Sequence, residues 1–140
     1  MNTKQSDTQL EYELQELYIL SQHWLQDISF MEDEVRFFKN ILLKYQEACP
    51  LKEMPATAAD FITKIRGQEQ HIDSLKIKIP EFLHFLKPFI DDSKKEMGID
   101  FLERYNKLRT ELRALFAAVK VTKTDLFNYT EAIMTKEKAV

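Results

Sequence analysis

Three histidines and one cysteine are the side chains of this sequence best suited to hold a metal ion or attack a substrate. Glu81 and His84 have the Glu-x-x-His spacing that supplies half of a di-iron carboxylate site on a helix. Such a site needs a second copy of the motif and two further glutamates, and this sequence has one copy. His23 and Asp27 lie one helical turn apart, which suits a shared ion or a surface hydrogen bond. A metal-binding bundle of the di-iron or hemerythrin type that uses these four residues is therefore one alternative.

Other catalytic chemistry has less support in the sequence. Cys49 is the one cysteine, so neither a disulfide within the chain nor a multi-cysteine metal site can form. Gly67 and Gly98 are the two glycines, too few for a glycine-rich phosphate loop or a nucleophile elbow. His71 lies next to the expected core and is interpreted as a partly buried structural histidine. We expect that the protein is not an enzyme, and that it has no catalytic residue, no cofactor and no small-molecule ligand.

Charge gives a general nucleic-acid role no electrostatic basis, because the net charge is −3. The charges are nevertheless uneven. Residues 11–34 hold seven acidic residues and no Lys or Arg, whereas residues 104–123 hold six basic residues and one acidic residue. We expect these two segments to neutralise each other. A nucleic-acid-associated regulator is a further alternative, and it would use Arg104, Lys107, Arg113 and Lys120.

Apolar residues at heptad spacing are the strongest signal in the chain. Alternate steps of four and three from Leu10 to Tyr45 meet apolar residues at every position except Ser21. The same steps over 61–89 are broken only by Gln68, and over 101–133 only by Thr122. We call these positions the heptad seam. A strand would alternate with period two, so the pattern predicts three long helices with coiled-coil-like packing.

The predicted fold is all-α, an up-down-up antiparallel bundle of three long helices within one domain over 1–140. The helices are expected over roughly 7–47, 57–89 and 94–136. Pro80 lies inside the second seam, where proline removes a helical hydrogen bond, so that helix should be kinked or split there. No segment has the apolar length of a membrane span, the first residues are polar, and we expect a cytoplasmic protein.

Aligning the three seams places the polar breaks Gln68 and Thr122 in one core layer, where they should share a hydrogen bond that fixes register. The same register predicts ion pairs between the helices, and also one unfavourable pair of carboxylates, Glu32 against Glu69. The four favourable pairs are Glu13–Arg109, Asp27–Lys123, Lys64–Asp125 and Lys78–Glu111.

Several bulky side chains fall outside the seam and its flanks, on one outer groove between the first and third helices. They are Phe30, Phe37, Ile41, Phe127 and Met134. Exposed apolar clusters of this kind usually mark contact sites. We expect a surface for self-association as a homodimer, or for another helical protein. Two alternatives stay open: the connection 46–56 covers the groove, or the groove binds a small molecule.

The segment Trp24-Leu25-Gln26-Asp27-Ile28-Ser29-Phe30-Met31-Glu32-Asp33-Glu34-Val35-Arg36-Phe37-Phe38 resembles the first helix of uncharacterised bacterial helical-bundle proteins of unknown function. In those helices a tryptophan and a leucine are followed by an acidic residue, an aliphatic residue, an aromatic, an acidic pair and two bulky residues. The resemblance implies a bacterial cytoplasmic protein and carries no activity or site. The sequence as a whole therefore predicts a non-enzymatic helical interaction or scaffold module.

Overall fold

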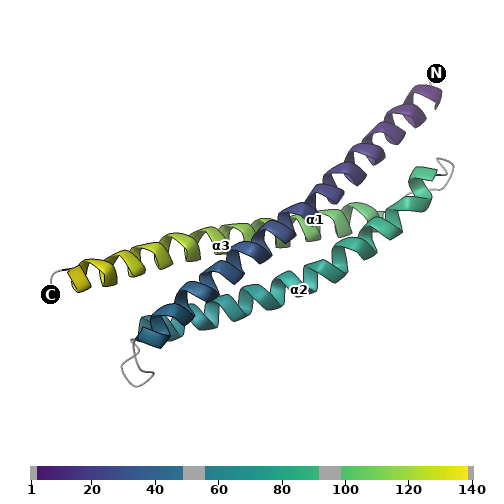
Figure 1. The fold of residues 1–140 in the computed structure, drawn as a ribbon. Helices are drawn as coiled ribbons and strands as arrows, with labels where there is room; N and C mark the ends of the chain where they lie inside the picture. The colour runs from purple at the N-terminus through teal and green to yellow at the C-terminus, as the bar shows by residue number, and fades with distance from the viewer. Residues whose placement is uncertain (1–2, 49–55, 92–98, 139–140) are drawn as a thin grey trace. The chain divides into compact units, whose positions relative to one another are not determined.

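The computed structural model describes residues 3–48, 56–91 and 99–138, with side chains over 12–44, 58–90 and 101–132. These residues form three long α-helices that pack against one another, α1 (Thr3–Ala48), α2 (Ala56–Asp91) and α3 (Ile99–Lys138) (Figure 1). No strand occurs in the described ranges. The all-α prediction is confirmed. The connection 49–55 and the predicted start of the third helix at 94 lie outside the described residues.

The heptad seam is the core. Every seam residue with a described side chain is buried or half-buried, and Ala58 is the one buried residue that extends the seam beyond its predicted start. Large apolar side chains one or two positions away, such as Leu20, Leu25 and Phe116, are exposed. Burial is thus confined to a narrow stripe on each helix, as expected when helices meet through alternating three- and four-residue steps.

Contacts between residues gather in two compact units, and each unit takes a part of all three helices. The first unit contains Met1–Ser29 and Asp73–Leu112, and the second contains Phe30–Ile72 and Arg113–Val140. The two units are described separately below. That the whole chain is one domain stays a prediction.

Aromatic rings dominate the core of the first unit. Trp24 of α1 stacks on Tyr105 of α3 with ring centroids 5.2 Å apart, and on Phe82 of α2 at 6.3 Å. Phe82 also stacks on Phe101 at 5.9 Å. Aromatic pairs at these distances add to the free energy gained by burial alone. The cluster therefore joins all three helices within this unit.

Aliphatic side chains, a few aromatic rings and one polar pair form the core of the second unit. Met31, Phe38 and Ile72 are almost completely buried. Toward one end of the unit the rings of Phe61 and Tyr129, from α2 and α3, lie 5.6 Å apart. This unit also holds two of the three polar seam residues, Gln68 and Thr122, whose contacts are given below.

Proline does not split α2. The helix runs from Ala56 to Asp91 through both Pro80 and Pro88. Pro80 is exposed, so water can solvate the carbonyl group that loses its helical donor at this position. The expected split is therefore not found, whereas a kink at Pro80 stays a prediction.

Gly67 lies inside α2 and is exposed there, although glycine disfavours a helix interior. A methyl group built at its α-carbon would meet no atom within 4 Å. Gly67→Ala is therefore expected to raise the free energy of unfolding by about 0.5–1 kcal/mol, since alanine loses less backbone entropy on folding. Urea denaturation of the dilute variant checks this prediction. Unchanged or lower stability would show that Gly67 has a structural role which its surroundings do not reveal.

Candidate functional site

Phe30 and Phe37 form an exposed aromatic ridge on α1. They are seven residues apart, so they lie on one face of the helix two turns apart. Their exposed fractions are 56% and 52%, although phenylalanine is usually among the more buried residue types. Ile41 continues the same face one turn further on and is half-buried. We call Phe30 and Phe37 the aromatic ridge.

Lys123 of α3 lies close to both Phe127 and the part of α1 that carries the ridge. Lys123 Nζ lies 3.3 Å from Glu34 Oε2, and Glu34 falls between Phe30 and Phe37 on the helix. The same ammonium group lies 5.9 Å from the ring centroid of Phe127, which is 40% exposed. The structure thus brings four of the five predicted interface residues to one region of the second unit. Met134 belongs to α3, and its side chain lies outside the described residues.

The ion pairs differ in part from the predicted ones. Lys123 pairs with Glu34, where the register predicted Asp27. Lys78 and Glu111 form the predicted pair at 3.4 Å. The two carboxylates that the register predicted to face each other, Glu32 and Glu69, each pair with a cation of α1: Glu32 lies 3.7 Å from Arg36, and Glu69 lies 3.6 Å from Lys39.

Gln68 and Thr122 make the hydrogen bond that the register predicts. Gln68 Nε2 donates to Thr122 Oγ1 at 2.7 Å and to the carbonyl oxygen of Ala118 at 3.3 Å. A carbonyl oxygen can only accept, so the amide nitrogen must face α3. The residue is only 7% exposed, and its Oε1 atom is consequently buried without a hydrogen-bond partner.

Small residues open a groove between α2 and α3 of the second unit. One wall carries Gly67, and the other carries residues with at most a short side chain, Ala114, Ala117, Ala118 and Val121. Lys64 and His71 stand at its α2 side, and Gln68, Leu115 and Thr122 also line it. The volume is about 590 Å³. We call this the alanine groove; His71, which borders it, is half-buried as expected.

The sequence prediction missed the alanine groove. Its signal was present, since Ala114, Ala117, Ala118 and Val121 follow the 3, 4, 7 spacing of a single helix face. The heptad pattern is defined by large apolar residues, whereas the residues of this stripe are small.

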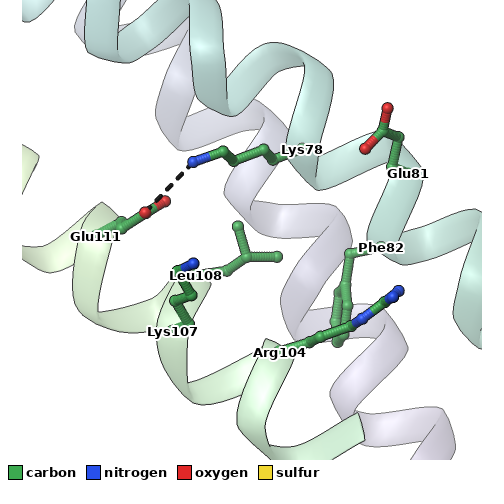
Figure 2. A pocket seen from close by; sticks show the side chains of 7 residues that line it. All are labelled: Lys78, Glu81, Phe82, Arg104, Lys107, Leu108 and Glu111. Atoms are coloured by element: carbon green, nitrogen blue, oxygen red, sulfur yellow. Dashed lines mark hydrogen bonds and ion pairs between the residues drawn. The ribbon is translucent and has the colours of Figure 1, made fainter. Parts of the chain in front are cut away.

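A smaller hollow of about 210 Å³ lies between α2 and α3 of the first unit (Figure 2). Lys78 reaches across it to Glu111, whose second carboxylate oxygen is buried without a partner. The guanidinium group of Arg104 lies 4.4 Å from the ring centroid of Phe85, a cation–π contact. Arg104 lines the hollow, as do Glu81, Phe82, Lys107 and Leu108. Cations and carboxylates are mixed here, so Arg104 and Lys107 do not form a purely basic surface.

The candidate metal ligands lie mostly at the surface. His23, Glu81 and His84 are exposed, and Asp27 is half-buried. Among the described residues, no three His, Cys, Asp or Glu side chains come close enough together to hold a metal ion. Cys49 lies outside the described residues.

Comparisons with protein-family models, with curated proteins and with solved structures found no match to this chain. The resemblance of residues 24–38 therefore leads to no family assignment. Among the helices that the structure describes, none combines the length and apolar character needed to cross a bilayer.

Proposed function

We propose that this chain is a non-enzymatic helical interaction module that self-associates as a homodimer through the aromatic ridge. One observation carries the proposal: two phenylalanines, each more than half exposed, stand two turns apart on one face of α1. Ile77 and Leu102 stand outside such a pair, whereas Tyr12 and Ile19, also seven residues apart on α1, are 67% and 53% exposed and form a second pair. Scattered apolar residues are normal on a protein surface, whereas exposed apolar residues that gather on one side of a helix can mark a contact.

An up-down-up order of the helices belongs to the same proposal. Two contacts between α2 and α3 in the second unit support it. Phe61 of α2 meets Tyr129 of α3, and Gln68, further along α2, meets Thr122, which is earlier in α3. The partner numbers fall along α3 as they rise along α2, as antiparallel helices require.

The energy available from the ridge is modest. Fully burying a phenylalanine side chain contributes about 1.5–3 kcal/mol relative to leaving it exposed. Roughly half of each ring is still exposed, so the four rings of two copies would contribute about 3–6 kcal/mol in total. Association costs at least about 4 kcal/mol in lost translational and rotational freedom. The ridge therefore needs a well-fitting receiving surface to hold a dimer.

Substitution of the ridge tests the proposed function. The double variant Phe30→Ser, Phe37→Ser is expected to keep its helical circular dichroism signal and to lose self-association. Neither ring belongs to the core, so the fold does not depend on them. Size-exclusion chromatography with light scattering should give the mass of one chain, 16.6 kDa, at concentrations where the unmodified protein gives twice that value.

A matched control separates the loss of the ridge from a general loss of exposed apolar area. Ile77→Ser, Leu102→Ser removes two side chains that are 64% and 56% exposed, also from helices. This variant carries the same two helix-disfavouring serines and should associate as the unmodified protein does. Equal association of all three proteins would contradict the assignment of the ridge.

A further inference from the structure

One face of α3 in the second unit carries cations and aromatic rings in alternation. Arg113, Phe116 and Lys120 follow one another at steps of three and four residues, which keeps them on one side of the helix. Phe127 continues this side two turns further on. Both cations are exposed, and the two rings are 41% and 40% exposed. We call these four residues the basic–aromatic stripe.

Carboxylates are absent from the sequence around this stripe. Residues 112–124 contain three cations and no Asp or Glu. Asp125 comes next along the chain but falls on another side of the helix, and Glu131 lies one turn beyond Phe127. The 14 residues from Arg113 to Phe127 rise about 21 Å at ~1.5 Å per residue. The stripe therefore presents charge of one sign over this length.

The acidic segment of α1 neutralises only part of this charge. The sequence predicts that residues 11–34 neutralise the basic segment of α3. In the second unit, Lys123 does pair with Glu34, at 3.3 Å. Arg113 and Lys120, in contrast, form no ion pair with any residue that the structure describes. Both cations thus remain free to bind an anion from outside the chain, although the net charge of the chain is −3.

Carboxylates of α1 in the same unit already have cationic partners. Glu34 is paired with Lys123, and Glu32 and Asp33 lie 3.7 Å and 3.4 Å from Arg36. Such pairs reduce the repulsion that these carboxylates exert on an anion nearby. An anion along α3 therefore meets the attraction of two free cations and only a weakened repulsion from α1.

A ring between two cations favours a single nucleic-acid strand over other polyanions. Such a strand offers phosphates, which attract Arg and Lys, and bases, which stack on aromatic side chains. Phe116 stands between Arg113 and Lys120, so one side of α3 offers both kinds of contact. Helices that bind an anionic bilayer separate their cations from their apolar face, and here the two share a side. An acidic polypeptide would use the cations and leave the rings unused.

From these observations we propose that the basic–aromatic stripe binds single-stranded nucleic acid without sequence preference. Arg113 and Lys120 contact phosphates, and Phe116 stacks on a base. Phe127, with Lys123 Nζ 5.9 Å from its ring centroid, extends the same surface. The inference does not rest on the proposed self-association, because Arg113, Phe116 and Lys120 are not among the predicted interface residues.

Fluorescence anisotropy of a labelled oligothymidylate of about 12 nucleotides tests the inference. At about 50 mM salt, binding to the unmodified protein is expected to saturate with a Kd of about 1–100 µM. Two phosphate contacts predict about sevenfold weaker binding at about 200 mM salt, since affinity for a single strand falls with a logarithmic slope of about −0.7 per contact. Absence of saturable binding at the lower salt concentration would overturn the inference.

Removal of the two cations gives the most specific result. Arg113→Gln, Lys120→Gln is expected to weaken binding at least about tenfold and to abolish its salt dependence. The matched control, Arg66→Gln, Lys87→Gln, removes the same charge from two exposed residues of α2 that also form no ion pair within the described ranges. It should bind within about twofold of the unmodified protein, because screening weakens distant charges. Equal affinities of the two double variants would contradict the assignment of the stripe.

Phe116→Leu separates base stacking from charge. Leucine keeps an apolar, helix-compatible side chain and removes the ring. Binding should become at least about fivefold weaker, the lower end of what one stacked base contributes. Unchanged affinity, or equal competition by polyglutamate, would show that the stripe attracts any polyanion and would overturn the assignment to nucleic acid.

Vesicles of phosphatidylcholine and phosphatidylserine provide the comparison with a lipid surface. The protein should stay in the supernatant when such vesicles are sedimented. Sedimentation with the vesicles that is lost in Arg113→Gln, Lys120→Gln would assign the stripe to a bilayer and overturn the inference. Light scattering of the same variants should give the mass of the unmodified protein, so the outcome is separable from that of the proposed self-association.

Discussion

Phe38→Ala is expected to lower the free energy of unfolding by about 3–5 kcal/mol, the cost of deleting a fully buried phenylalanine side chain. Phe38 is 0% exposed and occupies a seam position in the second unit. A loss of this size is a large part of the total stability of an ordinary domain, about 5–15 kcal/mol. We therefore expect a markedly lower urea midpoint and partial unfolding at moderate temperature.

The neighbouring residue supplies the control for this prediction. Phe37→Ala removes the same group from the next position of the same helix, where the ring is 52% exposed. In dilute protein, where association does not add to stability, this variant should lower the unfolding free energy by only about 1 kcal/mol, because about half of the ring is buried. Similar losses for the two variants would contradict the assignment of the heptad seam as the core.

Replacing Thr122 alone is expected to lower the free energy of unfolding, whereas replacing both Thr122 and Gln68 is expected to raise it. Thr122→Val removes the acceptor at 2.7 Å and leaves the amide of Gln68 with the longer contact to Ala118. We expect this single variant to lose about 1–3 kcal/mol, because a buried polar group is left poorly paired. Adding Gln68→Leu removes the amide and its unpartnered oxygen together. The free energy of unfolding of the double variant should then be about 1 kcal/mol higher than that of the unmodified protein.

Denaturant unfolding of the single and double variants measures this reversal. A double variant less stable than Thr122→Val alone would show that Gln68 stabilises the core through contacts other than this bond. If the pair also fixes the register of the helices, amide NMR spectra should show one set of peaks for the unmodified protein and additional sets for the double variant.

The sequence was sufficient to predict the three helices and their core, because heptad spacing leaves little freedom about which face is buried. It was also sufficient to align α2 with α3 at Gln68 and Thr122, since two polar interruptions of otherwise apolar seams have few ways to avoid unpaired burial. The exposure of Phe30 and Phe37 follows from the same pattern, as both lie outside the seam.

Other features depend on details that residue spacing does not contain. Lys123 has a long flexible side chain, and it pairs with Glu34 where Asp27 was predicted. The register of two helices shows which residues lie near each other, but not which of them pair. The continuity of α2 through Pro80 depends on the exposure of that turn to water. The spacing of the small residues on α3 is visible in the sequence, but their combination with Gly67 of α2 into one groove is not, because the two helices are far apart in the sequence.

The solution mass of the unmodified protein across a concentration series tests the central claim most directly. Self-association through the aromatic ridge predicts a light-scattering mass near twice 16.6 kDa at high concentration, which falls toward 16.6 kDa on dilution. A mass of 16.6 kDa at every concentration would contradict the claim that this chain forms a homodimer.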